Sequence, residues 1–222
     1  MALGTLLIEA LDIAPGDRIA LVGGGGKSTL MRHLYLEGTK RGWTCTAGTT
    51  TKVYASQAAE YPEFLASRTV NGKSEGLEPA AVDRYCDEHR PDLCIIEADG
   101  SRSRRVKAPS DNEPPIPGST TLVIAVIGAD ALDRVIEDVA HRPMRVAAVC
   151  GCGPYGRLTP ERAALLLTSD RGGRKNVPAS ARFAVAITRI GSRQEQLSDH
   201  LRSLLTAHGV PAVLLPALTA VD

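Results

Sequence analysis

The sequence has few aromatic residues, no excess charge of either sign and no long uninterrupted hydrophobic run. Phe, Trp and Tyr together make up 4% of the 222 residues. The 26 basic residues are balanced by 25 acidic ones, and the net charge of +1 argues against long-range attraction to nucleic acid or to a membrane surface. No apolar stretch approaches the roughly 18 residues that a membrane-spanning helix requires. We therefore expect a cytoplasmic protein without nucleic-acid or membrane partners, whose oligomeric state the sequence leaves open.

Cysteine is also scarce, and the pattern of the five cysteines does not suggest disulfide bonds. They are Cys45, Cys86, Cys94, Cys150 and Cys152. An odd number at irregular spacing favours reduced thiols in a cytosol. The pair Cys150 and Cys152 could chelate a soft metal ion, but no second cysteine or histidine pair at structural-zinc spacing follows. Buried thiols are therefore the favoured interpretation.

The sequence alternates apolar runs with helix-like segments. Six runs are almost continuously apolar, as strands covered on both faces are: 18–22, 44–50, 92–98, 120–127, 182–187 and 210–215. Helices are predicted over 27–41, 79–89, 160–167 and 192–208, and a short first helix precedes them. Thr159 is the expected N-cap of the third of these helices, and Ser192 with Glu195 the capping box of the fourth. This alternation predicts an α/β fold with a doubly wound, mainly parallel sheet and helices on both faces, as one domain over residues 1–222.

Two stretches of the sequence do not fit this alternation. Residues 67–78 and 101–119 are polar and rich in glycine, proline and charge, so both are predicted to be loops. The second is unusually long for a compact domain, and long loops of this kind are often functional.

A glycine-rich segment, VGGGGKS, lies between the first predicted strand and the first long helix. In such a turn, backbone amides and the helix N-terminus can bind a phosphate, while the lysine neutralises its oxygens and the serine hydroxyl can ligate Mg²⁺. The expected phosphate-binding residues are Gly23, Gly24, Gly25, Gly26, Lys27, Ser28 and Thr29. The common GxxxxGK(S/T) pattern would need glycine where Leu21 stands. The shorter GxxGK(S/T), found in Mur ligases and folylpolyglutamate synthases, fits instead.

Polar residues follow the second and third predicted strands. Glu97 and Asp99 come at the end of the third strand, where a carboxylate can hold Mg²⁺ together with Ser28. We expect both to reach the crevice, because strand alternation places residues i and i+2 on one side, although Asp99 could instead cap the turn at Gly100. Thr50, Thr51 and Lys52 follow the second strand and are expected to add phosphate contacts.

The base of the nucleotide is less clearly encoded. The guanine-selecting NKxD sequence is absent, since the chain reads Ile187-Thr188-Arg189-Ile190 at the expected position. ATP is therefore favoured over GTP, because adenine pockets are mostly apolar and leave little trace in a sequence.

Several motifs, in order along residues 10–190, resemble the YqeC family, described as a selenium-dependent hydroxylase accessory protein. They are VGGGGKSTL, TTTK, IIEADGSRSRRVKAP, DNEPPIP, ALDRVIEDVAHRP, LTPE and LLTSDRGGRKNVP. The resemblance implies an NTP-binding, P-loop-type accessory protein. It also implies partners among bacterial molybdenum hydroxylases that carry labile selenium, or among the proteins that mature their cofactor.

The same resemblance draws attention to Lys107, Asp111, Glu113, His141 and Arg142. Lys107 could clamp a second anionic group, or it could be a solvated loop cation. His141 could titrate near neutrality and move a proton, or it could only end a helix. The neighbouring basic residues Arg102, Arg104 and Arg105 are either an anion patch or a solvated face.

The sequence therefore predicts a Mg²⁺-dependent, NTP-binding accessory protein whose NTPase chemistry is carried by Lys27, Glu97, Lys107 and His141. Two alternatives stay open. In the first, nucleotide orders the loop 101–119 to grip a client protein and turnover is incidental. In the second, the protein is a small-molecule kinase or ligase whose loop holds the acceptor.

Overall fold

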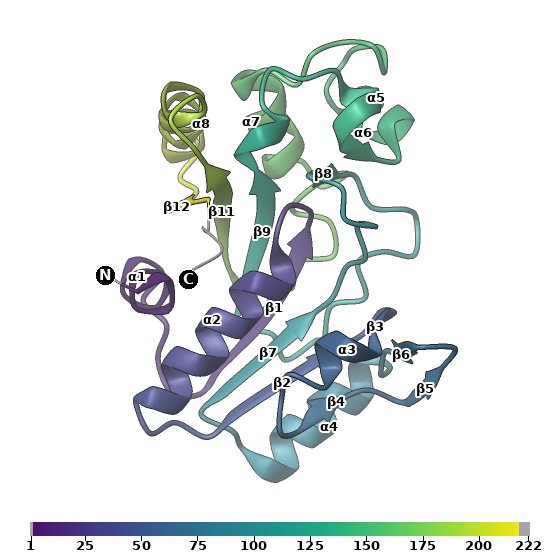
Figure 1. The fold of residues 1–222 in the computed structure, drawn as a ribbon, viewed down its shortest axis with the longest axis vertical. Coiled ribbons are helices and arrows are strands. Elements are labelled where there is room, and N and C mark those ends of the chain that lie inside the picture. Colours follow the sequence, from purple (N-terminus) through teal and green to yellow (C-terminus); the bar gives the residue numbers. More distant parts are fainter. Residues whose placement is uncertain (1, 218–222) are drawn as a thin grey trace.

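A seven-stranded parallel sheet forms the centre of the computed structural model, which describes residues 2–217 (Figure 1). Every neighbouring pair of strands in it is parallel, and their order is β12-β11-β9-β1-β7-β2-β4. The strands are β1 (Asp17–Gly23), β2 (Cys45–Thr49), β4 (Phe64–Leu65), β7 (Leu93–Glu97), β9 (Leu122–Gly128), β11 (Arg182–Ile190) and β12 (Ala212–Pro216). All six predicted strands are present, which confirms the predicted α/β fold.

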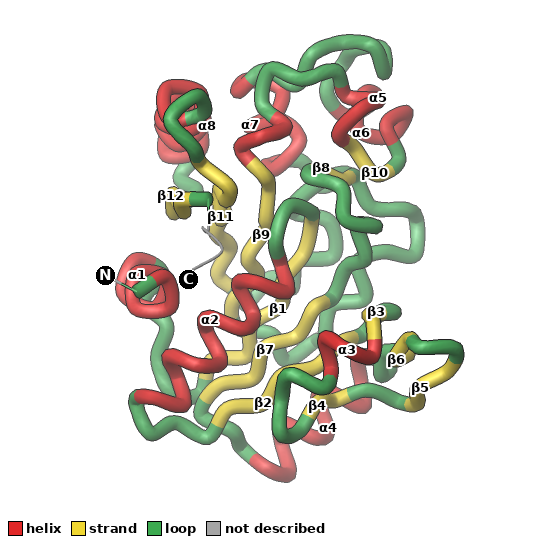
Figure 2. The backbone as a smooth tube through the Cα atoms, in the orientation of Figure 1, coloured by secondary structure: helices red, strands yellow, loops and turns green. Residues whose placement is uncertain are grey.

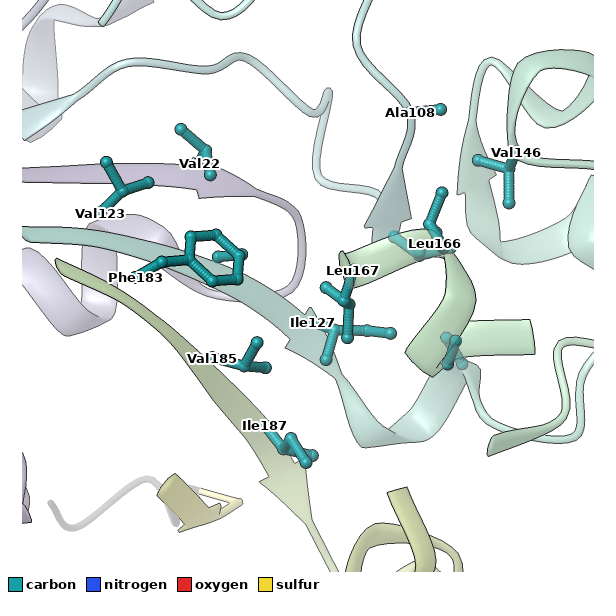
Figure 3. Packing of buried hydrophobic residues seen from close by; sticks show 14 of the residues in the cluster. Val22, Ala108, Val123, Ile127, Val146, Leu166, Leu167, Phe183, Val185 and Ile187 are labelled. Atoms are coloured by element: carbon teal, nitrogen blue, oxygen red, sulfur yellow. The ribbon is translucent and has the colours of Figure 1, made fainter. Parts of the chain in front are cut away.

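Helices cover both faces of this sheet. One face carries α1 (Leu3–Ala10) and α2 (Lys27–Lys40), and the other carries α4 (Pro79–His89), α7 (Pro160–Thr168) and α8 (Glu195–Ala207). Alternate residues of β1 pack in the two cores, with Ile19 and Leu21 facing α1 and α2. In the opposite core, Phe183 and Ile187 of β11 lie near Leu167 of α7 (Figure 3). Among residues 2–217 no helix has the length and apolar character needed to cross a bilayer.

The two predicted helix caps have different outcomes. Thr159 accepts a hydrogen bond from the Arg162 amide at 3.4 Å, which confirms it as the N-cap of α7. The prediction of a capping box at Ser192 and Glu195 is wrong, because α8 begins only at Glu195. The Gln194 amide donates to the Gly191 carbonyl at 2.8 Å, and this turn leaves Ser192 outside the helix.

Smaller elements lie beside the main sheet (Figure 2). The strands β3 (Val53–Tyr54), β5 (Arg68–Val70) and β6 (Lys73–Glu75) form an antiparallel sheet next to α3 (Ala55–Ala58), so the prediction of a plain loop over 67–78 is wrong. The segment 101–119 is mostly loop, with β8 (Val106–Lys107) paired to β10 (Ala140–His141). The remaining short helices are η1 (Ala129–Ala131), α5 (Ile136–Val139) and α6 (Pro143–Val149).

Candidate functional site

The turn between β1 and α2 needs glycine because it packs against the backbone of neighbouring segments. Gly25 and Gly26 have φ angles of +93° and +133°, which side chains with a Cβ rarely adopt. A Cβ at Gly25 would lie 2.3 Å from the amide nitrogen of Gly128, at the end of β9. The glycines therefore allow the turn to pack closely against the carboxyl end of the sheet, beside its central strands.

Backbone amides at the start of α2 are left free for a ligand. The first three glycine amides already donate to protein acceptors: Gly23 to Asp99 Oδ2 at 3.1 Å, Gly24 to the Val126 carbonyl at 2.9 Å, and Gly25 to the Arg104 carbonyl at 3.1 Å. The amides of residues 26–29 have no acceptor among the described residues. The predicted amide nest is thus confined to Gly26–Thr29, while Gly23 and Gly24 do not line the cavity in front of it.

The structure brings Lys27, Ser28 and Glu97 together at this helix start. Lys27 is buried, its Nζ donates to the Gly23 carbonyl at 2.8 Å, and Nζ lies 3.7 Å from Glu97 Oε1. Ser28 Oγ donates to Glu97 Oε2 at 2.9 Å. Gln57 Nε2 donates to Ser28 Oγ at 2.9 Å, and nothing in the sequence pointed to this residue. A hydroxyl and a carboxylate therefore meet beside a buried ammonium group.

This pair of oxygen donors suits Mg²⁺ bound together with a phosphate. Mg²⁺ prefers oxygen ligands and is commonly held by one or two protein groups plus substrate phosphates. Ser28 Oγ and Glu97 supply two such groups next to the free amides. Among residues 2–217, no three His, Cys, Asp or Glu side chains are grouped so as to hold a metal ion by themselves. The residues present therefore fit Mg²⁺ brought in with a nucleotide.

Asp99 and Lys107 lie behind the turn, in a buried ion-pair network. Lys107 Nζ contacts the Asp99 carboxylate, donates to the Gly100 carbonyl at 2.7 Å and lies 2.8 Å from Glu113 Oε2. Burial raises the pKa of Asp99, and the positive charge of Lys107 opposes this rise. Neither Asp99 nor Lys107 lines the large cavity described below. Their geometry makes them supports of the turn, with Asp99 joining Lys107 to the Gly23 amide.

Glu113 extends this network towards Arg142. The carboxylate accepts two hydrogen bonds from the Arg142 guanidinium, at 2.6 and 3.0 Å. Burial alone would raise the pKa of Glu113, but the bonds from Arg142 and Lys107 outweigh it and hold this pKa well below its usual range. The carboxylate therefore stays charged at neutral pH and fixes Arg142. Asp111, the other acid of this segment, pairs with Arg145 at 3.0 Å.

Of the three predicted phosphate-binding residues after β2, two line the large cavity described below and one does not. Thr50 Oγ1 donates to the Pro115 carbonyl at 2.8 Å and does not line the cavity. Thr51 and Lys52 do line it, and Lys52 pairs with Glu75 of β6 at 2.9 Å. The structure therefore keeps two of these three residues within reach of a ligand.

A cavity of about 850 Å³ opens in front of the free amides. It is strongly cationic, because eight basic residues line it: Lys27, Lys52, Lys73, Arg102, Arg104, Arg105, Arg142 and Arg189. Glu97 and Glu113 are the only acidic residues among its described lining residues. A molecule with a net charge of +1 thus concentrates positive charge in one place.

His141 also lines this cavity, and its pKa is far from neutral. Burial, followed by the positive charges of Arg142, Lys107 and Arg102, lowers the pKa to about 4. The expectation that His141 titrates near neutrality is therefore wrong for the protein alone. The imidazole is therefore neutral at physiological pH.

A second, smaller cavity of about 180 Å³ shares Gly25, Gly26 and Thr29 with the first. Its described lining mixes polar and apolar groups: Leu3, Gly25, Gly26, Thr29, Leu30, Thr188, Arg189, Leu215, Pro216 and Ala217. Thr188 Oγ1 donates to the Gly25 carbonyl at 2.6 Å, so the segment found in place of NKxD supports the turn. Arg189 lines both cavities.

The cysteines take no part in either cavity. All five are free thiols, and burial raises the pKa of Cys150 to about 12. Within residues 2–217 they belong to no group of three or more His, Cys, Asp or Glu side chains that could hold a metal ion.

Comparison with known proteins places these features in a family. A family model described as "YqeC protein" matches residues 19–144. An Escherichia coli (strain K12) protein described as "Uncharacterized protein YqeC" is 30% identical over 219 residues, which cover 89% of this chain and 86% of that protein. Among solved structures, the hydrogenase maturation factor HypB from Archaeoglobus fulgidus is similar with a TM-score of 0.49 and 12% identity, covering 96% of this chain and 85% of that one. The residues matched by the family model include the turn, Glu97 and the network up to Arg142.

Proposed function

The chain belongs to the YqeC family, and we propose that it binds a Mg²⁺–nucleoside triphosphate and hydrolyses or transfers the terminal phosphoryl group. One observation carries the proposal. Four backbone amides without an acceptor among residues 2–217, the buried Lys27 ammonium group and the Ser28–Glu97 pair converge at the start of one helix, inside a cationic cavity.

The amides of Gly26–Thr29 and the N-terminus of α2 would hold the phosphates. Lys27 would exchange the Gly23 carbonyl for a phosphate oxygen, which is a more favourable partner for an ammonium group. Ser28 and Glu97 would hold Mg²⁺, which neutralises charge on the phosphates when bound. Gln57 keeps the Ser28 hydroxyl oriented. Phosphoryl transfer depends mainly on positioning and charge neutralisation, and these residues supply both.

ATP is the nucleotide that the site supports best. The smaller cavity adjoins the large one at Gly25 and Gly26 and includes apolar side chains such as Leu30 and Leu215. Its described lining has no carboxylate to accept hydrogen bonds from the N1 and N2 groups of guanine. An adenine base needs no such partner. We assign the base to this cavity.

The biological role in the proposal follows from the family resemblance. The motif resemblance to the YqeC family implies an accessory role for selenium-dependent molybdenum hydroxylases. We therefore propose such a hydroxylase, or a protein that matures its cofactor, as the partner. Nucleotide turnover would serve that maturation step.

Enzymatic turnover is favoured over a purely nucleotide-gated loop. The segment 101–119 is already tied to the body of the protein: Thr50 to the Pro115 carbonyl, Lys175 to the Ser110 carbonyl, Asn176 to the Pro114 carbonyl and Asp83 to the Ser119 amide. A segment held by so many internal bonds gains little order from a ligand. An order–disorder switch is therefore a weaker explanation for this loop.

The substitution Lys27→Ala tests the proposal. Loss of a charge-assisted phosphate contact should weaken Mg²⁺–ATP binding by about 100-fold, corresponding to roughly 3 kcal/mol. The matched control is Lys40→Ala, which removes an exposed lysine from the other end of the same helix. Isothermal titration should show the loss only for Lys27→Ala. Equal affinities in the two variants would reject the site.

A further inference from the structure

We propose that the part of the large cavity around Arg102, His141 and Arg142 is a second anion-binding site. It would take an oxyanion group, phosphate or carboxylate, of a small-molecule second substrate. The inference rests on the proposed function, since it places an acceptor molecule beside the terminal phosphate of the nucleotide. It favours a small-molecule kinase or ligase over a simple NTP hydrolase.

The first argument is an excess of uncompensated positive charge. Several lining cations have acidic partners: Lys52 pairs with Glu75, Arg142 with Glu113, and Arg105 and Arg189 share one oxygen of Asp130. Within residues 2–217 the Arg104 side chain donates to the neutral Asp138 carbonyl, at 2.5 Å, and pairs with no carboxylate. Among the described residues the Arg102 side chain makes no hydrogen bond or ion pair. Two guanidinium groups therefore face the cavity without a counter-charge.

Backbone geometry at Arg102 supports a binding role. Arg102 and Ser103 are consecutive non-glycine residues with φ of +49° and +61°, a left-handed conformation that costs about 1–2 kcal/mol per residue. The flanks hold this conformation in place, because the Arg104 carbonyl accepts the Gly25 amide and the Arg105 amide donates to the Val139 carbonyl at 3.1 Å. Strained backbone fixed in this way is typical of binding sites. The hydrogen bond between the Gly25 amide and the Arg104 carbonyl joins this segment to the phosphate-binding turn.

His141 shows that these positive charges converge on one point. After burial, the charges of Arg142, Lys107 and Arg102 lower its pKa, so their side chains act on the same imidazole ring. A neutral ring adds no charge of its own but offers one donor and one acceptor nitrogen. An oxyanion placed there would gain the free guanidinium of Arg102 and a hydrogen bond from His141.

The cavity has space for both ligands. At about 850 Å³ it is within the range that holds a whole drug-sized molecule, whereas the amides of residues 26–29 bind only the phosphates. Arg102 follows Glu97 by five residues, so the two Cα atoms lie at most roughly 18 Å apart. A small acceptor bound at Arg102 would therefore reach towards the metal end of the cavity.

The experiment is a phosphate titration of nucleotide-loaded protein. Wild-type protein is saturated with Mg²⁺ and a non-hydrolysable ATP analogue, so that the terminal phosphate position is filled. Inorganic phosphate is then titrated by calorimetry, and acetate in a parallel arm, which separates a phosphate-bearing from a carboxylate-bearing substrate. We expect one additional anion per chain.

The test variant is Arg102→Asn, because asparagine tolerates a left-handed backbone and carries no charge. Its matched control is Arg90→Asn. Arg90 is exposed, has φ of +48° and lines neither cavity. We expect Arg102→Asn to weaken binding of the added anion at least tenfold, with a much smaller change in affinity for the ATP analogue. Arg90→Asn should change neither.

Each outcome decides the proposal. Absence of additional anion binding to the loaded wild-type protein overturns it, as does equal anion affinity in the Arg102→Asn and Arg90→Asn proteins. If the ATP analogue itself does not bind, the proposed function fails instead. In that case the same phosphate and acetate titrations are done on the nucleotide-free protein. Anion binding that weakens in Arg102→Asn but not in Arg90→Asn supports the second site, and any other result rejects it.

Discussion

Glu97 has two roles at the residue scale, because its carboxylate contacts both the Ser28 hydroxyl and the Lys27 ammonium group. The substitution Glu97→Gln keeps the shape and one acceptor oxygen but removes the negative charge. We expect ATP affinity to change little and Mg²⁺-dependent phosphate release to fall by about 100-fold, since the metal loses its charged ligand. Glu60→Gln, at an exposed position, is the matched control. Equal turnover in the two variants would remove Glu97 from the metal site.

His141 gives the protein a predictable response to acid. Its pKa is about 4 when folded, against 6.5 for the unperturbed residue. Above about pH 6.5 the His141 side chain is neutral in both the folded and the unfolded protein, so it adds no pH dependence to the free energy of unfolding. As the pH falls below this value the unfolded chain takes up a proton that the folded protein refuses, so stability is lost down to about pH 4.

The variant His141→Gln lacks this proton uptake. Solvent screening at this partly exposed ring reduces the effect, so between about pH 7.5 and about pH 5 the wild-type free energy of unfolding should fall by about 1 kcal/mol more than that of the variant. Urea unfolding at both pH values measures the difference. His208→Gln, at an exposed site, controls for the general loss of a histidine. A variant with the same acid sensitivity as the wild type would contradict the cause given for the pKa.

The sequence revealed the parts of the site that local chemistry encodes. Lys27 and Ser28 lie within one motif, and Glu97 lies at the end of a predicted strand. Asp99 was expected beside Glu97, but β7 ends at Glu97, so the alternation of strand faces no longer applies two residues later. Gln57 could not be found, because its bond to Ser28 joins residues 29 positions apart and depends on the fold.

At the scale of elements, the turn before α2 is the part of the fold that tolerates least change. Gly25→Ala combines a φ of +93° with a Cβ only 2.3 Å from the Gly128 nitrogen. Gly16→Ala is a matched control, with a φ of +97° and no atom within 4 Å. We expect about 1–2 kcal/mol of destabilisation for Gly16→Ala and about 3–5 kcal/mol for Gly25→Ala, because the second adds a backbone clash.

Urea unfolding of the two glycine variants measures this difference, and ATP titration shows whether the turn still binds phosphate. Only Gly25→Ala should lose nucleotide affinity. If both variants were destabilised equally, the close approach of the turn to β9 would play no energetic role.

Long apolar elements were predictable from the sequence, whereas short polar ones were not. Each central strand is covered on both faces, and the resulting apolar run marks it; all seven residues of β9 are buried. In contrast, all three residues of β5 are exposed and β3 has only two residues, so neither strand shows a repeating apolar pattern in the sequence. These short strands exist through pairing with β6, which local sequence does not specify.

At the scale of the whole molecule, charge is distributed unevenly despite a net charge of +1. The basic residues of the large cavity come from segments spread between Lys27 and Arg189, and the parallel sheet gathers them at its carboxyl ends. The family resemblance predicted from scattered motifs is confirmed by the comparisons, and the motifs mostly map to these same segments. Composition alone could not reveal this cavity, because balanced totals conceal local excess.

Nucleotide binding should also be visible as a stability change of the whole protein. A ligand that binds only the folded state at about 100 times its dissociation constant adds about 2.7 kcal/mol, which for a chain of this size raises the melting temperature by roughly 5–10 °C. We expect this shift with Mg²⁺–ATP, a smaller one with ATP alone and a smaller one with Mg²⁺–GTP. Differential scanning fluorimetry of wild type and Lys27→Ala measures all three. A larger shift with GTP would contradict the assignment of an adenine base to the smaller cavity. Shifts that persist in Lys27→Ala would place the nucleotide elsewhere on the molecule.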